Sequence, residues 1–358
     1  MEPVRIGILG CGKVSHQYLP NLIRSPVTDV VAVADIDSDA AAHVADRYRI
    51  PHAVTPDELV ADRSIALVLN LTPIAAHVGV TRAALAAGKH VYSEKPLATS
   101  AAEAQELVAE AARRGLSLAC APDTLLGSGF QAGWAALAAG RIGRPLSATA
   151  VMLRSSLTVP SAYSEGRTPF LDMAPYYLSA LVNLFGPAVR VSGAARTSTA
   201  GKTAEQRPMG AAISVSGVVE FASGAVANVS LVWGIAHRSE IPAVHVYGTD
   251  GAITLPNPNN FADPAYIRRY GERDWNELPG SGPTNGGPHN QRGLGVAEMV
   301  VAIQEGRIPR ASAELACHVV DLVGALVRSG ERGERVELTT TCTPPSPIPA
   351  DARERLLV

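Results

Sequence analysis

The sequence is poor in cysteine and in long apolar runs, and each shortage excludes a class of protein. Its four cysteines are scattered over 358 residues, which argues against a zinc site or a disulfide framework and suits a reducing compartment. No apolar run approaches the roughly 18 residues that a membrane-spanning helix needs. A strand-like run begins at residue 4, which leaves no room for a signal peptide. We therefore expect a cytoplasmic protein with no membrane partner and no bound metal.

Excess charge of either sign is also missing. The formal net charge of −2 gives no reason to expect a nucleic acid partner, and the length suits two domains rather than one. Lysine is scarce, because nearly all the positive charge is arginine, so a lysine near a cleft stands out. The lysines are Lys13, Lys89, Lys95 and Lys202.

A glycine turn follows the first strand-like run. Residues 4–9 are mostly apolar, as a buried parallel strand should be. Glycine at Gly10 and Gly12 lets the backbone turn tightly and approach a pyrophosphate at the N-terminus of the next helix. Ser15 replaces the third glycine of the G-x-G-x-x-G motif, and a plain glycine turn is the alternative. The cofactor-binding candidates of this turn are Gly10, Gly12, Lys13 and Val14.

The second strand-like run, residues 29–35, ends in an acidic residue. The Asp35 carboxylate can accept hydrogen bonds from an adenosine ribose and would repel a 2′-phosphate. Ile36, rather than an arginine, follows it. Both observations favour NAD over NADP as the cofactor.

Helix-like and strand-like runs alternate as far as residue 123. Helical patterns at 40–48, 77–88 and 100–115 separate strand patterns at 65–72, 90–96 and 116–123. This alternation predicts a doubly wound parallel sheet, a Rossmann domain over residues 1–123, with ligands beyond the carboxyl ends of its strands. The cofactor-binding candidates near these ends are Leu71, Thr72, Pro73, His77, Glu94, Lys95 and Asp123.

The alternation stops after residue 123, and grouped strands follow. Helical patterns occur at 131–140, 172–186, 295–306 and 313–330, and hairpin turns at Ser223–Gly224 and Asp250–Gly251 join strand-like runs. We predict an α+β domain over 124–340, in which helices cover one face of a large, mainly antiparallel sheet. Its other face would need a second subunit to cover it. A proline-rich, extended tail occupies 341–358.

Several stretches resemble the Gfo/Idh/MocA family, named after glucose–fructose oxidoreductase, inositol dehydrogenase and a rhizopine-catabolism protein. The resemblance runs from about residue 4 to residue 320, and its most specific element is EKP at 94–96. The other stretches are GILGCGKVS, VAVAD, NLTPIAAH, AGKHVYSEKPLA, APDTLLG, GRIGRPLSATA, DMAPYY, VYGTDGAITLPNPNNF and RGLGVAEMVVAI. The resemblance implies a homodimer or homotetramer, joined through the open sheet, that oxidises or reduces a ring hydroxyl of a sugar or polyol with a nicotinamide cofactor.

Such a reaction must move a hydroxyl proton as well as a hydride, and three residues are candidates for that task. Lys95 stands at a strand end where the cofactor should lie; a salt bridge to Glu94 is the alternative. The resemblance implies that Asp172 contacts the substrate, and helix capping is the alternative. Tyr176 lies four residues later, so on a helix it shares a face with Asp172. A merely packed tyrosine is the alternative there.

Tyr176 stands where many relatives carry a histidine and the glucose–fructose oxidoreductase branch carries a tyrosine. A phenol with a pKa near 10 is a poor base at neutral pH. We expect the Lys95 ammonium and an oxidised nicotinamide to lower this pKa, by about two units.

The substrate wall is the least defined part of the site. Arg154 and Arg167 flank a segment that departs from the family pattern, and either can hold a carboxylate or phosphate or be solvated. His289 lies in a glycine-rich loop that can enter the cleft or be an ordinary loop.

The sequence thus predicts an NAD-dependent oxidoreductase that acts on a secondary hydroxyl of a sugar, cyclitol or sugar derivative. An NAD-dependent glycosidase or epimerase, which oxidises its sugar transiently without net redox change, is the alternative. A non-catalytic dinucleotide-sensing regulator is a third.

Overall fold

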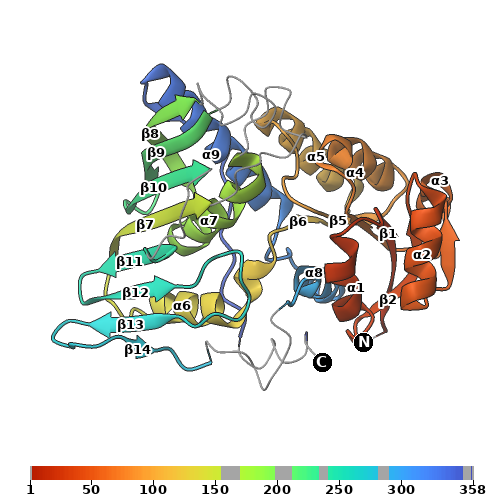
Figure 1. Cartoon of the computed structure of the whole chain (residues 1–358), viewed down its shortest axis with the longest axis horizontal. Coiled ribbons are helices and arrows are strands. Elements are labelled where there is room, and N and C mark those ends of the chain that lie inside the picture. The colour runs from red at the N-terminus through yellow and green to blue at the C-terminus, as the bar shows by residue number, and fades with distance from the viewer. Residues whose placement is uncertain are drawn as a thin grey trace.

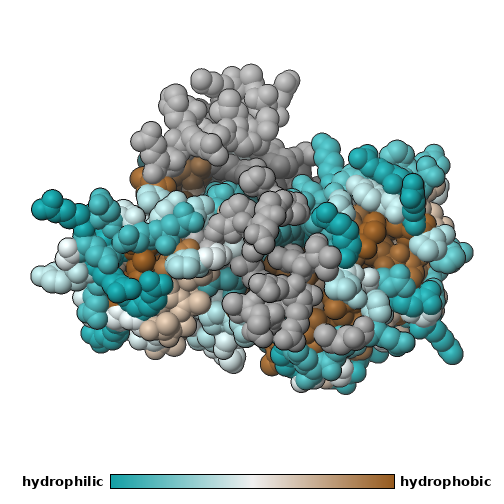
Figure 2. Space-filling view, turned by 90° about the horizontal axis from the view of Figure 1, so that it is seen from below, coloured by the Kyte–Doolittle hydropathy of each residue, from teal (hydrophilic) through white to brown (hydrophobic). Residues whose placement is uncertain are grey.

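The computed structural model describes residues 2–154, 170–197, 212–233, 241–280, 290–349 and 356. Two sheets lie side by side, with helices around the first and between the two (Figure 1). Most of the described surface in the view of Figure 2 is hydrophilic, and its apolar side chains lie mainly in recesses. None of the helices within the described ranges is long and apolar enough to cross a membrane.

The first sheet has six parallel strands in the order β3-β2-β1-β4-β5-β6, which confirms the predicted doubly wound sheet. Its strands are β1 (Val4–Leu9), β2 (Thr28–Ala34), β3 (His52–Val54), β4 (Leu67–Asn70), β5 (His90–Ser93) and β6 (Leu118–Cys120). Its helices are α1 (Ser15–Leu22), α2 (Ser38–Tyr48), α3 (Pro56–Ala61), α4 (His77–Ala86) and α5 (Ala101–Arg114). Two single-turn 3-10 helices, η1 (Ile74–Ala76) and η2 (Thr124–Leu126), follow β4 and β6. This strand order places the carboxyl ends of β1, β4 and β5 next to one another.

The second sheet has nine strands in the order β14-β13-β12-β11-β7-β10-β9-β8-β15. Only the β7–β10 pair is parallel among the described pairs, so the sheet is mainly antiparallel, as predicted. Turns at the two predicted positions join β9 to β10 and β11 to β12. The strands are β7 (Pro145–Arg154), β8 (Ala188–Thr197), β9 (Ala212–Phe221), β10 (Val226–Trp233), β11 (Val244–Gly248), β12 (Gly251–Leu255), β13 (Tyr266–Arg269), β14 (Asn276–Glu277) and β15 (Val336–Glu337).

Three helices cover one face of the second sheet: α6 (Ser128–Ala138), α7 (Phe170–Phe185) and α9 (Ala313–Arg332). In Figure 1, α7 and part of α9 lie between the two sheets, and α6 lies beside β12 and β13. Their apolar side chains and the inward side chains of the strands form one buried cluster, which includes Trp134, Leu178 and Leu322. On the opposite face, Val218 and Val226 are more than a third exposed.

The helix α8 (Leu294–Gln304) packs with the first sheet, although it follows the second sheet in the chain. Its apolar side chains, such as Val296 and Met299, join the buried cluster that contains Ile6 and Tyr18. A chain cut at the predicted division at residues 123 and 124 would separate α8 from the sheet against which it packs. The division itself remains a prediction.

The tail crosses back over the body of the protein. Residues 341–349 carry no helix or strand. The backbone N–H of Ile348 donates to Oε1 of the buried Gln131 at 2.7 Å, and the Arg310 side chain donates to the carbonyl of Ser346 at 2.9 Å. The described part of the tail is therefore packed rather than free.

Candidate active site

The two glycines of the first turn have different surroundings. Gly10 has φ +103°, and a Cβ there would lie 2.7 Å from the carbonyl of Leu71, so the close approach of β1 to the loop after β4 requires glycine. A Cβ on Gly12 would meet nothing within 4 Å. Open space beside the first turn of α1 is what a pyrophosphate needs, and the exposed Lys13 and Val14 border it.

The acidic residue Asp35 lies directly after β2, at the strand end where it is predicted. Asp35 is half-buried, and its carboxylate accepts hydrogen bonds from the backbone N–H groups of Cys11 (2.7 Å) and Asp37 (3.0 Å). These bonds fix the carboxylate at the edge of the glycine turn. The next side chain, Ile36, is 98% exposed and brings no positive charge to this edge.

The loops after β4 and β5 are joined by a buried histidine. His77 is 1% exposed, with its Nε2 2.8 Å from the Thr72 carbonyl and its Nδ1 2.7 Å from the Pro96 carbonyl. Burial lowers the pKa of His77, although both carbonyls favour the doubly protonated ring. His77 therefore joins the two loops from the buried side. Pro73, in the loop after β4, is exposed.

Lys95, which follows β5, reaches across to the second domain. Its ammonium donates to Oδ1 of Asp172 at 2.6 Å and to the Asp172 carbonyl at 2.9 Å. The alternative partner, Glu94, accepts a hydrogen bond from the Lys95 backbone N–H instead. The helix α7 begins at Phe170, so Asp172 lies in its first turn rather than at the cap position that the sequence suggested.

Tyr176 lies one turn further along α7 and shares the face of Asp172. Its ring centroid is 5.4 Å from the Lys95 ammonium, which places Lys95 between the two side chains. The phenolic oxygen accepts a hydrogen bond from Nη2 of Arg292 at 3.0 Å. Tyr176 is 2% exposed, whereas its neighbour Tyr177 points its hydroxyl toward Asn257.

Burial decides the protonation of this cluster. It raises the pKa of Tyr176 above its ordinary value, although the cationic Lys95 and Arg292 both oppose this rise. The predicted net fall of this pKa below its ordinary value is therefore wrong here, because the loss of hydration outweighs the two cations. Burial alone would lower the pKa of Lys95, but the acidic groups of Tyr176, Asp172 and Glu94 together raise it by more, and Asp172 also accepts its hydrogen bond. Lys95 is thus an ammonium group and not a base.

Arg292 is the central residue that the sequence did not suggest. Its Nε donates to Gln17 on α1 at 2.9 Å, and its Nη1 lies 3.6 Å from Oε1 of Glu94 and 4.0 Å from Oδ1 of Asp123. Charged groups of opposite sign at these distances hold the guanidinium in one place. The signal in the sequence was weak, because an arginine after an irregular glycine-rich loop is usually a solvated side chain.

Asp123, a predicted cofactor-binding residue, is fully buried. Its Oδ2 accepts hydrogen bonds from the backbone N–H groups of Gly293 (2.9 Å) and Gly295 (3.3 Å), where α8 begins. Burial raises its pKa to about 6, against the opposing effect of Arg292. Asp123 thus holds the start of α8 and the neighbouring Arg292, and its contact with a cofactor stays a prediction.

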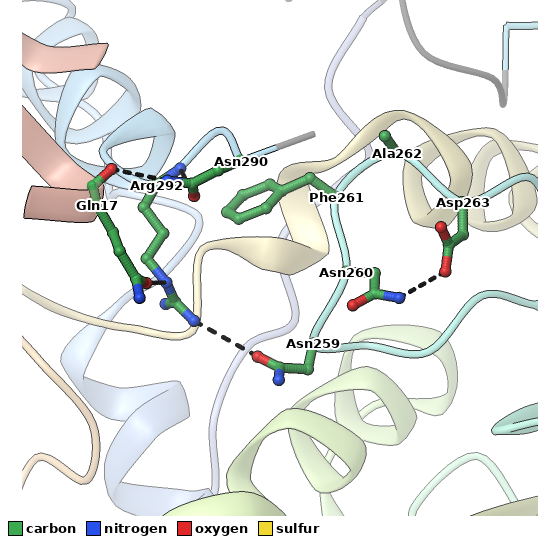
Figure 3. Close-up of a pocket in the computed structure, with 8 residues that line it drawn as sticks. All are labelled: Gln17, Asn259, Asn260, Phe261, Ala262, Asp263, Asn290 and Arg292. Atoms are coloured by element: carbon green, nitrogen blue, oxygen red, sulfur yellow. Dashed lines mark hydrogen bonds between the residues drawn. The ribbon is translucent and has the colours of Figure 1, made fainter. Parts of the chain in front are cut away.

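A polar cavity of about 550 Å³ opens beside Arg292 (Figure 3). Gln17 and Arg292 form one wall, and the loop after β12 forms the other, with Asn259 bonded to Arg292 across the gap. Half of the lining residues carry a carboxamide, which offers hydrogen-bond donors and acceptors without charge. The lining residues are Gln17, Asn259, Asn260, Phe261, Ala262, Asp263, Asn290 and Arg292.

The three tentative substrate residues cannot be placed. Arg167, His289 and the side chain of Arg154 lie outside the described residues. Within the described part of the chain, no cluster of histidine, cysteine, aspartate or glutamate is suited to a metal ion.

Comparison with known proteins identifies the family. A family model described as an oxidoreductase family with an NAD-binding Rossmann fold matches residues 4–121, and the model of the GFO/IDH/MocA C-terminal domain matches residues 130–254. An uncharacterized oxidoreductase of Rhizobium meliloti, ORF334, is 26% identical over 340 residues, or 93% of this chain and 98% of that protein.

A sugar-nucleotide reductase is more similar over a shorter stretch. The dTDP-3,4-didehydro-2,6-dideoxy-alpha-D-glucose 3-reductase of Streptomyces violaceoruber is 33% identical over 198 residues. The match covers 54% of this chain and 58% of that enzyme, less than two-thirds of its length.

Among solved structures, a levoglucosan dehydrogenase in complex with NADH and L-sorbose superposes with a TM-score of 0.83. It is 20% identical, over 95% of this chain and all of the other, and this likeness shows the fold alone. The two family models together span most of the chain, with the whole first sheet and most strands of the second. The chain is a member of the Gfo/Idh/MocA family of NAD-binding oxidoreductases.

Proposed function

We propose that this protein transfers a hydride between NAD and a secondary hydroxyl or ketone of a sugar, cyclitol or sugar derivative. The observation that supports it most directly is the meeting of Lys95, Asp172 and Tyr176 at the carboxyl end of β5. A lysine from the cofactor domain and a carboxylate and phenol from the second domain converge there. A substrate held between the domains would contact all three.

The dinucleotide would lie along the carboxyl ends of β1, β2, β4 and β5. The open space at Gly12 suits a pyrophosphate, and the fixed carboxylate of Asp35 suits an adenosine ribose. The exposed loop at Thr72 and Pro73 would border the nicotinamide half. When bound, the nicotinamide supplies the hydride acceptor or donor.

The protein's own groups would manage the proton and the hydroxyl groups. Tyr176 would exchange a proton with the reacting oxygen, as a base during oxidation and as an acid during reduction. Lys95, held as an ammonium by Asp172, would donate a hydrogen bond to the same oxygen and stabilise negative charge on it. The second oxygen of Asp172 would accept a hydrogen bond from a neighbouring hydroxyl.

The charge balance of this cluster favours a neutral substrate. Both cations of the described cluster already face carboxylates, Lys95 at 2.6 Å from Asp172 and Arg292 at 3.6 Å from Glu94. A phosphate or carboxylate on the substrate would find no free cation among these residues. The chain is similar to a sugar-nucleotide reductase in sequence and to a levoglucosan dehydrogenase in fold. Of these two kinds of substrate, the charge balance favours the uncharged sugar or polyol.

The test is a panel of neutral polyols, sugars, sugar phosphates and uronic acids with NAD and NADP, in which the absorbance of the reduced cofactor is followed. We expect oxidation of a neutral member with NAD. Steady conversion of a glycoside or epimer with retained cofactor and no accumulation of NADH would identify the glycosidase or epimerase alternative instead.

We also propose that the uncovered face of the second sheet joins subunits into a homodimer or homotetramer. Val218 and Val226 are exposed there on adjacent strands, which supports burial against a partner. Val218→Glu should then lower the mass in solution measured by light scattering. A cytoplasmic location is the matching proposal, because all four cysteines are free and buried, and subcellular fractionation tests it.

A further inference from the structure

Tyr176 and Arg292 come from opposite sides of the cleft and meet at the phenolic oxygen. Tyr176 lies on α7 under the second sheet, and Arg292 precedes α8, which packs on the first sheet. Nη2 of Arg292 lies 3.0 Å from the Tyr176 oxygen. Lys95, the cation expected to act on this phenol, stands against the ring and donates its hydrogen bonds to Asp172 instead.

In the hydrogen bond between Arg292 and Tyr176, the guanidinium can only be the donor. Arginine is only a hydrogen-bond donor and does not lose its proton in proteins. The phenolic oxygen must therefore accept from Arg292, and the phenolic hydrogen is left to point at another acceptor. In a cleft that holds a ketone or an alkoxide, that acceptor is the substrate oxygen.

The surroundings of Arg292 keep the guanidinium in place before any substrate binds. Gln17 accepts from Nε at 2.9 Å, and Asn259 accepts from Nη2 at 3.4 Å. The side chain of Asn21 donates to the Arg292 backbone carbonyl at 2.8 Å. The Arg292 side chain is only 13% exposed, so water competes little for its hydrogen bonds.

We infer that Arg292 is a positioning residue for the proton-transferring tyrosine: its guanidinium holds the Tyr176 oxygen and directs the phenolic hydrogen toward the substrate oxygen. This inference rests on the function proposed above. Arg292 also stabilises the phenolate that remains after proton donation, because a charge-assisted hydrogen bond strengthens as its acceptor becomes negative. The residue thereby serves both directions of the reaction.

A double-mutant cycle with Tyr176→Phe and Arg292→Met separates this role from a general structural one. We expect Arg292→Met to lower kcat by about 10- to 100-fold when Tyr176 is present, the range for a hydrogen bond to a charged group. The same change in the Tyr176→Phe background should lower kcat less than about twofold. Equal losses in both backgrounds would overturn the inference. Arg82→Met, which removes an exposed arginine on α4, is the matched control.

A titration without substrate keeps the inference testable if no sugar is turned over. The ultraviolet absorbance of tyrosinate is followed against pH, and the curve of Tyr176→Phe is subtracted from that of the intact protein to isolate Tyr176. The same subtraction in the Arg292→Met background should give a midpoint at higher pH, because a cation that favours phenolate is gone. An unchanged midpoint contradicts the inference. If Arg292→Met does not fold, Gln17→Ala, which releases Nε of Arg292, replaces it in the same comparison.

The two experiments also separate the failure of the inference from the failure of the proposed function. If the intact protein oxidises none of the polyols, the proposed function fails, and the titration still decides whether Arg292 holds the phenol. If turnover is present and the double-mutant cycle shows no coupling, the function stands and the role of Arg292 is wrong.

Discussion

The ammonium of Lys95 lies 2.6 Å from the carboxylate of Asp172, and this pair joins the two domains at the candidate active site. The two side chains are 77 residues apart in the chain and come from the loop after β5 and from α7. Each is mostly buried, with exposed fractions of 13% and 24%. The pair keeps Lys95 charged and directs it toward the face of α7 that also carries Tyr176.

Loss of the Lys95 charge should stop turnover without abolishing cofactor binding. Lys95→Met is expected to lower kcat by about 100-fold or more, because a positioned donor to the reacting oxygen is removed. NADH affinity, measured by fluorescence titration, should change much less, since the glycine turn and Asp35 stay intact. Activity close to that of the unaltered protein would show that Lys95 takes no part in the reaction. Lys95→Arg keeps the positive charge but moves the donor atoms, so it tests whether charge alone is sufficient.

Substitution by alanine should lower stability at Gly10 and cofactor affinity at Gly12. Gly10→Ala forces a Cβ against the Leu71 carbonyl at a positive φ, so we expect a loss of roughly 1–3 kcal/mol in the free energy of unfolding. Gly12→Ala meets no protein atom within 4 Å and should leave stability nearly unchanged while weakening NADH binding. Thermal unfolding and NADH titration of both variants decide the point. Tight NADH binding by Gly12→Ala would contradict the placement of the pyrophosphate.

The preference for NADH over NADPH should depend on Asp35 and Ile36, which follow β2. Because the Asp35 carboxylate would repel a 2′-phosphate, the intact protein should bind NADH more tightly than NADPH. The double change Asp35→Ser and Ile36→Arg should reverse this order by supplying a cation in place of an anion. Asp29→Ser, at an exposed position at the start of β2, is the matched control. Tighter binding of NADPH by the intact protein would overturn the role of Asp35.

Asp123 should make stability depend on pH in a defined window. Burial raises its pKa to about 6, whereas an unfolded aspartate titrates near 3.9. An acid whose pKa is raised on folding stabilises the fold fully below the unfolded value, and this stability is lost as pH rises toward 6. Asp123→Asn stays neutral throughout, so its free energy of unfolding relative to the intact protein should rise by about 3 kcal/mol from pH 3.5 to 7. Parallel stability curves for the two proteins, measured by urea unfolding, would show that Asp123 is not the group responsible.

The regular parts of the fold were open to sequence reasoning because they are periodic. The apolar strand runs and the helical pattern of residues 100–115 predict the doubly wound sheet, and the structure confirms it. β3 and β15 have three and two residues, too few for any period to be visible. The helix α8 was assigned by its position in the chain, whereas its packing depends on the long-range contacts of Asp123 with Gly293 and Gly295.

The candidate site can be predicted from sequence only where its reactive side chains lie on one helix or strand. The spacing of Asp172 and Tyr176 places both on one helix face, and both contact Lys95. The contact of Arg292 with Tyr176 joins residues 116 positions apart, and no local pattern predicts it. The predicted direction of the Tyr176 pKa shift is wrong. A sequence indicates which charges lie nearby but not how deeply the phenol is buried, and burial has the larger effect.

The central claim, that Tyr176 moves the substrate proton, is tested most directly by the pH dependence of polyol oxidation in Tyr176→Phe and Tyr177→Phe. Oxidation needs the phenolate, so the rate of the intact protein should increase with pH and continue to increase into the alkaline range, because burial raises the Tyr176 pKa. Tyr176→Phe should lose about 100-fold or more of this rate and its dependence on pH, whereas Tyr177→Phe should stay within about twofold of the intact protein. Equal rates and equal pH profiles for Tyr176→Phe and the intact protein would contradict the account.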